Sequence, residues 1–352
     1  MKLSIKTNSD YDVIVDYSAL ESFDSHLSLF NKNQLFVLCF SSNLEVQSKK
    51  LNILLKEKGY NIKLLRIKDG EKEKEIDNVK YLIQELVNFE ANRNTVLIAF
   101  GGGSVGDMVG FVSSIYMRGI EYINIPTTLL SMVDSSLGGK TAVNYSGIKN
   151  IVGSFYQPSM VCIDPSMLST LSSKDIRSGI GEIIKYGMIY KCSIIDNLKE
   201  NYNCIIQLKN KDLILNIIFE CCSIKKKYIE SDEKDEGVRN ILNFGHTLGH
   251  LIESKYQSQE ISHGEAIING MRLAIELSYF KKLMSREVYS QIKDICKILN
   301  INYDYKLNSD DIENIKYDKK QSSNRYRFIL LQNIGEPIIC DDISKDDILS
   351  VI

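Results

Sequence analysis

The sequence has almost no surplus of charge. Its 352 residues include 43 Lys and Arg against 45 Asp and Glu, which leaves a formal net charge of −2. A protein that binds nucleic acid or an anionic membrane over a broad surface depends on an excess of basic side chains. The near balance therefore argues against both partners, while a local basic pocket for a small anionic molecule stays compatible with it.

Long hydrophobic runs are also missing. The most apolar stretch, TVLIAFGGGSVGDMVGFV, is interrupted by Gly102, Gly103 and Asp107, whereas a membrane-spanning helix needs about 20 predominantly apolar residues. The first residues, MKLSIKTNSDYDVIVDYS, contain no apolar segment of signal-peptide length. The eight cysteines form neither a CxxC zinc pattern nor a dense disulfide framework. We expect a cytoplasmic protein with reduced, mostly buried thiols.

The first 165 residues alternate between strand-like and helix-like segments. Apolar runs predict buried strands at 35–40, 61–67 and 95–100, and helical spacing predicts helices at 44–58 and 73–88. This alternation is typical of a parallel sheet with right-handed crossovers. We predict an α/β, Rossmann-like NAD-binding domain over residues 1–165, with its ligand at the carboxyl ends of the strands.

Helical patterns dominate the rest of the chain. They predict helices at 178–190, 212–229, 246–255, 263–280 and 286–299, and only residues 325–331 have the character of a strand. We predict a mainly α-helical zinc- and substrate-binding domain over residues 166–352. At roughly 150 residues per domain, the length also predicts about two domains.

A glycine-rich turn, GGGSVGD (101–107), follows the predicted strand at 95–100. Glycine lets the backbone approach a pyrophosphate, and the N-terminus of a following helix offers N–H donors and a positive dipole end. The turn is not the GxGxxG fingerprint, and no Walker lysine follows it, so a purely structural turn is the alternative. Its place after the third strand favours a nucleotide site.

Histidine is scarce, and three of the four residues lie close together in the sequence. His246 and His250 are four residues apart on one face of a predicted helix, a spacing that suits metal ligands, and His263 begins the next helix. Glu182 is the best carboxylate partner, because it is a lone acid in an apolar helical stretch. A His/His/Glu set with an open position is typical of catalytic zinc; three separate polar histidines are the alternative.

Several cations could bind an anionic substrate. They are Arg118, Lys140, Lys185, Lys225, Arg239, Lys319 and Lys320. Each alone is interpreted as a surface charge, although Arg118 and Arg239 border apolar or motif-bearing segments. The residues therefore predict an enzyme with a nucleotide domain, a catalytic metal and an anionic substrate, and they leave the reaction open.

Taken together, the motifs closely resemble the 3-dehydroquinate synthase family, which belongs to the sugar-phosphate cyclases. They are DGEKEK (69–74), GGGSVGD (101–107), YMRGI (116–120), IPTTLLSMVDSSLGGKTAVN (125–144), KNIVGSFYQP (149–158), SGIGEIIKYG (178–187), RNILNFGHTLGH (239–250) and HGEA (263–266). The resemblance implies a phosphate lyase of the shikimate pathway that converts 3-deoxy-D-arabino-heptulosonate 7-phosphate (DAHP) to 3-dehydroquinate, with NAD oxidising and then re-reducing the substrate.

The resemblance also implies the site residues. One divalent metal, zinc or cobalt, would be bound by Glu182, His246 and His263. NAD would contact Asp69, Glu71, Lys74, Gly103, Asp107, Thr127, Thr128, Lys140, Lys149 and Thr170. The substrate phosphate would meet Lys140, Asn150, His250 and one of Lys319 and Lys320, together with Arg118 from a second subunit of a homodimer. Lys225 and Arg239 would bind the carboxylate, and Asp134, Lys185 and Asn243 the ring hydroxyls.

The chain departs from the family pattern at a few positions. Asp235 stands where the family usually has glutamate, Gly181 where it usually has alanine, and residues 40–43 lack its common acidic or amide residue, which leaves the ribose contact open. Three alternatives remain: a cyclase such as 2-deoxy-scyllo-inosose synthase, whose substrate has no carboxylate; a metal-dependent polyol dehydrogenase; and a silent zinc-stabilised binding protein. The Lys225 and Arg239 pair favours the carboxylated substrate over the first.

Overall fold

The computed structural model describes residues 1–68, 70–190, 193–256, 261–298, 305–313, 315 and 325–352. They form two compact units, Met1–Leu171 with Lys225–Lys234, and Ser172–Ile224 with Asp235–Ile352. The first unit thus extends slightly beyond the predicted boundary at residue 165. It also takes in residues 225–234, which the prediction assigned to the second domain, because Lys225 pairs with Asp134 and Glu230 accepts a hydrogen bond from the Lys6 backbone.

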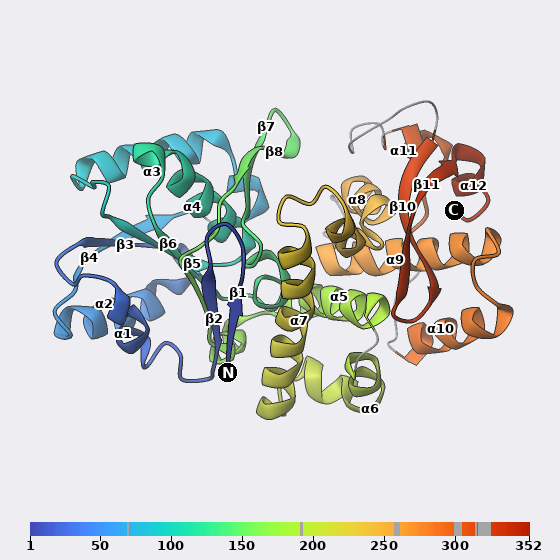
Figure 1. Ribbon diagram of the computed structural model, residues 1–352, viewed down its shortest axis with the longest axis horizontal. Coiled ribbons are helices and arrows are strands. Elements are labelled where there is room, and N and C mark those ends of the chain that lie inside the picture. Colours follow the sequence, from blue (N-terminus) through green and yellow to red (C-terminus); the bar gives the residue numbers. More distant parts are fainter. Residues whose placement is uncertain (69, 191–192, 257–260, 299–304, 314, 316–324) are drawn as a thin grey trace. The chain divides into compact units, whose positions relative to one another are not determined.

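A seven-stranded sheet forms the first unit, in the order β1-β2-β9-β6-β5-β3-β4 (Figure 1). Its strands are β1 (Lys2–Ile5), β2 (Tyr11–Val15), β3 (Leu35–Ser41), β4 (Asn61–Ile67), β5 (Val96–Gly101), β6 (Tyr122–Pro126) and β9 (Met160–Ile163). All neighbours pair in parallel except β1 and β2. The predicted α/β class and the three predicted strands are confirmed. The four other strands are only four or five residues long, too short for a clear periodicity.

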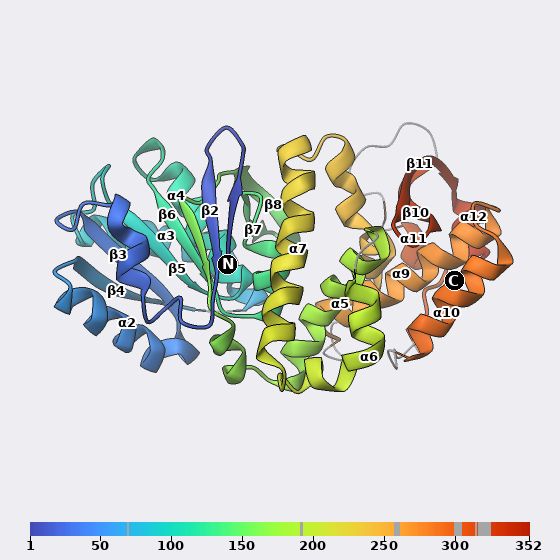
Figure 2. The same ribbon diagram turned by 60° about the horizontal axis from the view of Figure 1, so that its bottom comes forward.

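Helices cover both faces of this sheet (Figures 1 and 2). They are α1 (Phe23–His26), α2 (Glu45–Glu57), α3 (Ile76–Asn88) and α4 (Gly103–Ile115). Alternate strand residues such as Val37, Cys39 and Leu65 share one hydrophobic core with α3 and α4. Successive strand residues face opposite sides of the sheet, and helices cover both sides. The central strands are therefore apolar throughout.

The strand order reverses between β3 and β5. From β3 the chain moves outward to β4, and from β5 it moves outward in the other direction to β6. Ligands of open α/β sheets bind at the carboxyl ends of the strands beside such a switch point. The glycine-rich turn lies there, since Gly101 ends β5 and α4 begins at Gly103. A hairpin, β7 (Lys140–Tyr145) with β8 (Ile148–Phe155), packs next to α4.

Helices dominate the second unit. They are α5 (Ser173–Ile189), α6 (Ile194–Ile206), the first part of α7 (Lys211–Ser231), α8 (His246–Lys255), α9 (His263–Phe280), α10 (Arg286–Ile298), α11 (Ser309–Glu313) and α12 (Lys345–Leu349). The predicted helices are confirmed. The expectation of a single late strand was wrong, because β10 (Arg325–Asn333) pairs with β11 (Glu336–Ser344), whose Pro337, Asp341 and Asp342 interrupt an apolar pattern. No described helix has the length and apolar character needed to cross a membrane.

Glycines allow helices α5, α8 and α9 to touch through their backbones. A Cβ atom on Gly181 of α5 would lie 2.6 Å from the Cα atom of Gly264 in α9, and a Cβ on Gly264 would lie 2.1 Å from the Ser178 carbonyl oxygen. A Cβ on Gly270 of α9 would lie 1.9 Å from the carbonyl oxygen of Gly245, just before α8. The departure from alanine at position 181 thus falls where two backbones meet.

We expect Gly264→Ala to destabilise the protein. Its Cβ would collide with a backbone atom that cannot move without shifting α5, and overpacking of this kind costs about 1–3 kcal/mol. Thermal unfolding followed by circular dichroism measures the effect. Gly187→Ala on α5 is the matched control, since its Cβ would meet only side-chain atoms of Ile194 and Ile195. Equal melting temperatures for both variants would contradict the role of the glycine contact.

Candidate metal centre and nucleotide site

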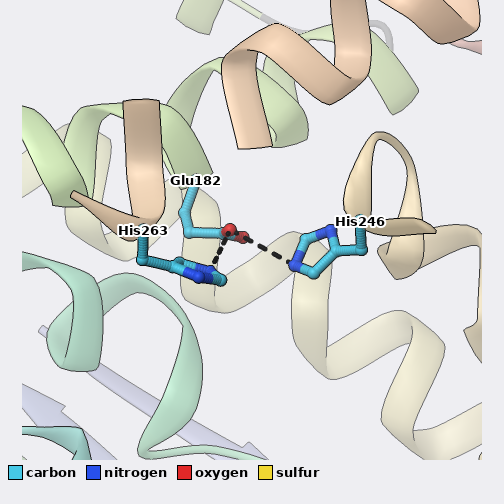
Figure 3. Close-up of side chains that lie close together, drawn as sticks. All are labelled: Glu182, His246 and His263. Carbon is cyan, nitrogen blue, oxygen red and sulfur yellow. Dashed lines mark ion pairs between the residues drawn. The ribbon is translucent and has the colours of Figure 1, made fainter. Parts of the chain in front are cut away.

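Three predicted metal ligands lie together in the second unit (Figure 3). Glu182 Oε1 is 3.5 Å from His246 Nε2 and 3.5 Å from His263 Nε2, and one ligand atom from each residue lies within 4.8 Å of the others. Zinc ligands at about 2.1 Å in a tetrahedron are themselves separated by about 3.4 Å. The spacing of the three donor atoms therefore fits a small divalent cation.

The carboxylate of Glu182 is fully buried, with 0% of the residue exposed. Lys185, one turn further along α5 and equally enclosed, forms an ion pair with it. A buried carboxylate is costly unless cations and hydrogen-bond donors surround it. Glu182 thus lies among positive or potentially metal-binding groups, which is the environment a metal ligand requires.

His246 is prepared to act as a neutral ligand. Burial lowers the pKa of His246 to about 3, so the imidazole stays neutral at neutral pH. Its Nδ1 lies 3.2 Å from the Phe244 carbonyl oxygen. Because a carbonyl oxygen only accepts hydrogen bonds, Nδ1 carries the proton and Nε2 turns its lone pair toward Glu182.

His263 lies between two carboxylates. Its Nε2 faces Glu182, and its Nδ1 is 3.4 Å from Glu253 Oε2. Burial would lower the pKa of His263, but the hydrogen bonds and charges of Glu182 and Glu253 outweigh it and raise the pKa to about 9. The position therefore favours positive charge, as a cation site should.

Two further residues, His250 and Glu253, lie beside this set. The ring of His250 is exposed, with its centroid 5.3 Å from that of His246 and 6.0 Å from that of His263. Glu253 did not emerge from the sequence reasoning. Its signal was present, however, because His246, His250 and Glu253 follow the i, i+4, i+7 spacing of one helix face.

Two other predicted residues of the second unit lie in or beside the short 3₁₀ helix η7 (Val238–Asn243), which packs against α5. Arg239 is only 1% exposed and is one of the largest fully buried side chains among the described residues. Asn243 is the last residue of η7 and is half-buried. A guanidinium buried to this degree needs acceptors around it, as a carboxylate-binding residue would.

The first unit presents a cradle at the N-terminus of α4. A Cβ on Gly103 would lie 2.9 Å from Ser135 Oγ, and one on Gly102 would lie 3.2 Å from Thr128 Cγ2. Thr127 donates its backbone N–H to the Gly101 carbonyl at 2.9 Å, which joins the ends of β5 and β6. Ser135 Oγ is buried and has no hydrogen-bond partner among the described residues. A pyrophosphate fits such a glycine-lined helix start.

A polar network around the buried Lys74 connects four predicted residues of the first unit. Lys74, which is 3% exposed, donates to Asp107 Oδ2 at 2.6 Å and to Asn150 Oδ1 at 2.5 Å. Asn144, which sequence reasoning missed, donates to Glu71 Oε1 at 3.0 Å and accepts from the Asn150 backbone N–H at 2.9 Å. Asn144 ends the motif at 125–144, but no role was predicted for it because its hydrogen-bond partner Glu71 is distant along the chain.

Asp134 and Lys225 form an ion pair of 3.0 Å in the first unit. Lys225 Nζ also donates to the Asp134 backbone carbonyl at 2.7 Å. Asp134 lies in a single π-helical turn (Ser131–Ser135), a conformation that is frequent at functional sites. The prediction gave these two residues separate substrate groups, whereas here they contact each other.

The remaining predicted residues are exposed or undescribed. Arg118 is exposed and has a left-handed φ of 68°, Lys140 and Lys149 are exposed at the β7–β8 hairpin, and the Thr170 hydroxyl donates to the Met167 carbonyl at 2.7 Å. No contact described here joins Thr170 to the α4 cradle. Asp69, Lys319 and Lys320 lie outside the described residues.

Two protein-family models match most of the chain. The 3-dehydroquinate synthase N-terminal model matches residues 64–178, and the 3-dehydroquinate synthase C-terminal model matches residues 179–321. A curated 3-dehydroquinate synthase from Clostridium tetani (strain Massachusetts / E88) is 37% identical over 359 aligned residues, which cover 100% of this chain and 94% of that protein.

Solved structures share the fold. A 2-deoxy-scyllo-inosose synthase, crystallised with carbaglucose-6-phosphate, NAD⁺ and Co²⁺, matches with a TM-score of 0.88 and 26% identity over 100% of both chains. An iron-containing alcohol dehydrogenase from Thermotoga maritima matches with a TM-score of 0.69 and 14% identity, over 99% of this chain and 98% of that one. The second likeness shows the fold alone.

We expect Lys74→Met to destabilise the first unit, because Asp107 would lose its buried partner. Breaking such a pair costs about 3 kcal/mol at neutral pH, which urea unfolding measures. Burial already raises the pKa of Asp107, against the pull of Lys74. A carboxyl group whose pKa is raised in the folded state lowers stability only at pH values at which it ionises on unfolding. The stability lost in Lys74→Met should therefore shrink as the pH falls to about 4.

The double variant Lys74→Met/Asp107→Asn is the control. The amide carries no charge, so this protein should recover part of the lost stability at neutral pH and show little of the pH dependence. If Lys74→Met is as stable as the wild type at neutral pH, the ion pair does not contribute as described.

Proposed function

The chain belongs to the 3-dehydroquinate synthase family, and we propose that it converts DAHP to 3-dehydroquinate and inorganic phosphate. The observation that carries the proposal is 37% identity across the whole chain to a 3-dehydroquinate synthase, combined with a compact Glu182, His246 and His263 set. The enzyme is a carbon–oxygen lyase of the shikimate pathway, which leads to chorismate and the aromatic amino acids. It uses NAD and one divalent metal ion.

The reaction requires a transient oxidation. A ring hydroxyl is oxidised to a ketone, which acidifies the neighbouring C–H bond, so that phosphate can leave. The ketone is then reduced again, the ring opens, and an intramolecular aldol reaction closes the carbocycle. Bound NAD would supply both the oxidation and the later reduction, so that no external oxidant would be consumed. By resemblance to the family, the substrate's own phosphate would carry out much of the proton removal, without a dominant protein base.

The metal would be held by Glu182, His246 and His263, as the 3.5 Å separations of their donor atoms support. A divalent ion supplies Lewis-acid polarisation of a substrate oxygen when it is bound. His246 contributes a neutral Nε2, and Lys185 would orient a ring hydroxyl beside the buried carboxylate. The ring hydroxyls would also be oriented by Asn243 and Asp134, as the resemblance implies.

NAD would be bound by the first unit. The cradle at Gly103 supports a pyrophosphate at the N-terminus of α4, where the helix dipole and backbone N–H groups stabilise negative charge. The other proposed NAD contacts are Asp69, Glu71, Lys74, Asp107, Thr127, Thr128, Lys140, Lys149 and Thr170. The hydrogen bonds of the buried Lys74 to Asp107 and Asn150 support a preorganised position for this part of the set.

The cations would bind the two anionic ends of the substrate. The phosphate would be held by Lys140, Asn150, His250 and Lys319 or Lys320, and Arg118 would extend to the phosphate bound by the other subunit of a homodimer. The exposure of Arg118 supports that reach. The substrate carboxylate would be bound by Lys225 and Arg239, as the resemblance implies.

The proposed carboxylate-binding role of Lys225 and Arg239 favours this activity over that of the related cyclase, whose substrate has no carboxylate. The 2-deoxy-scyllo-inosose synthase shares the fold at 26% identity, below the 37% identity to 3-dehydroquinate synthase.

We further propose that the protein binds neither nucleic acid nor membrane, because its net charge is close to zero. A cytoplasmic location is consistent with the buried thiols of Cys39, Cys162, Cys221 and Cys222.

We expect many phosphates to be released from DAHP per NAD, with no lasting NADH. Phosphate release and NADH absorbance are followed together, with the enzyme supplied with a divalent metal and trace NAD. Because reduction follows oxidation within each turnover, NADH should not accumulate. NADH formed in proportion to product would instead make the chain a polyol dehydrogenase, and turnover of glucose 6-phosphate in place of DAHP would make it the related cyclase.

A Glu182→Gln variant tests the metal set. The amide keeps the shape of the side chain but loses the charge that binds the cation, so we expect metal affinity to fall by more than about 100-fold, beyond the effect of an outer-sphere change. Metal content after dialysis and the rate of phosphate release measure it. Full occupancy together with full activity would show that Glu182 is not a ligand.

A further inference from the structure

Glu253 contacts the ring nitrogen of His263 that faces away from the proposed metal position. Glu253 Oε2 lies 3.4 Å from His263 Nδ1, whereas His263 Nε2 faces Glu182 Oε1 at 3.5 Å. We propose that Glu253 is a positioning residue of the metal centre. It accepts the Nδ1 proton of His263, and this bond fixes the tautomer and the ring orientation that present Nε2 to the metal. The inference rests on the metal set of the proposed function.

His246 shows the same arrangement with a different acceptor. Its Nδ1 is bonded to the Phe244 backbone carbonyl at 3.2 Å. Both imidazoles therefore have an acceptor on the outer nitrogen, which is the usual way in which a protein selects the coordinating nitrogen of histidine. A carboxylate accepts more strongly than a carbonyl and makes the imidazole a better donor. Of the two histidines, His263 is therefore the one whose strength as a metal ligand depends on a neighbouring side chain.

The helix cap holds the backbone of His263, whereas Glu253 contacts its ring. His263 is the first residue of α9, and the helix start is fixed by a capping box in which Ser262 and Glu265 bond to each other's backbone N–H groups at 3.0 and 3.3 Å. That cap holds the backbone of His263 but does not touch its ring. Rotation of the ring is restrained on the outer side by Glu253.

Glu253 is placed well for a lasting contact. It lies on α8, seven residues after His246, and its side chain is only 18% exposed. Water screens a partly buried, charge-assisted hydrogen bond much less than a surface ion pair. The contact therefore places a carboxylate acceptor at the outer ring nitrogen of His263, in surroundings that water screens only weakly.

A direct metal-binding role for Glu253 is the competing arrangement. His250, Glu253 and His263 also offer ligand atoms within 4.8 Å of one another. That set would use the opposite side of the His263 ring and would include the exposed His250 instead of the buried Glu182. Burial of Glu182 between two Nε2 atoms favours the first set, in which Glu253 stays outside the coordination sphere.

The test measures the affinity of the full-length protein for Co²⁺ by competition with a chelator, for wild type, Glu253→Gln and Glu253→Ala. We expect Glu253→Ala to weaken Co²⁺ binding about 10- to 100-fold, the range for loss of an outer-sphere partner. Glu253→Gln should weaken it less, since the amide oxygen still accepts a hydrogen bond. Glu287→Gln, an exposed carboxylate of α10 with no metal contact, is the control and should bind like the wild type.

Wild-type Co²⁺ affinity in both Glu253 variants overturns the proposal. So does a result in which His250→Ala abolishes binding and His246→Ala does not, because Glu253 would then be a ligand. If Glu253→Ala does not fold, the affinity and visible Co²⁺ absorption of the isosteric Glu253→Gln decide alone. Phosphate release by the wild type, measured on the same preparation, separates this outcome from failure of the proposed function: an active, metal-binding wild type with unaffected variants removes only the role of Glu253.

Discussion

Close backbone contact among three helices is the constraint on which the metal site depends. Each proposed ligand is adjacent in sequence to a glycine at a helix contact: Gly181 precedes Glu182, Gly245 precedes His246, and Gly264 follows His263. Metal–ligand distances tolerate only about 0.2 Å of error, and a side chain at these contacts would separate the helices by far more. Helix packing and ligand geometry are thus specified by neighbouring residues.

Buried charge is the second organising feature, and both units contain it. Glu182 is enclosed with Lys185 in one unit, and Lys74 with Asp107 in the other. Buried ion pairs are weak contributors to stability compared with well-packed apolar groups. Their presence beside a cation set and beside a helix N-terminus is explained by binding: charges held in place before the ligand arrives need little rearrangement when it binds.

The fold by itself does not choose the reaction. The same architecture occurs in a cyclase that was crystallised with a sugar-phosphate analogue and in an iron-containing alcohol dehydrogenase. The choice of reaction therefore depends on individual side chains rather than on the architecture, and in this chain these include the buried Arg239 and the hydrogen bond that connects Lys74 to Asn150. Function follows from the groups placed on the scaffold, as it does in other widely used folds.

The sequence by itself determined the features that depend on neighbouring residues. Periodicity located β4, α8 and α9 with their observed bounds, the spacing of His246 and His250 placed them on one helix face, and the glycine-rich turn was correctly placed before a helix. Recognisable motifs supplied the family. These signals are local, because hydrogen bonding and side-chain direction repeat every two residues in a strand and about every 3.6 in a helix.

Only the tertiary structure decided how distant residues meet. It paired β11 with β10, joined Asn144 to Glu71, and placed Glu253 at the outer nitrogen of His263. It also placed Glu182 between two histidines from other helices. Such contacts join segments far apart in the chain, and their geometry depends on how closely whole helices approach. Local periodicity carries no information about that approach, whereas packing in three dimensions does.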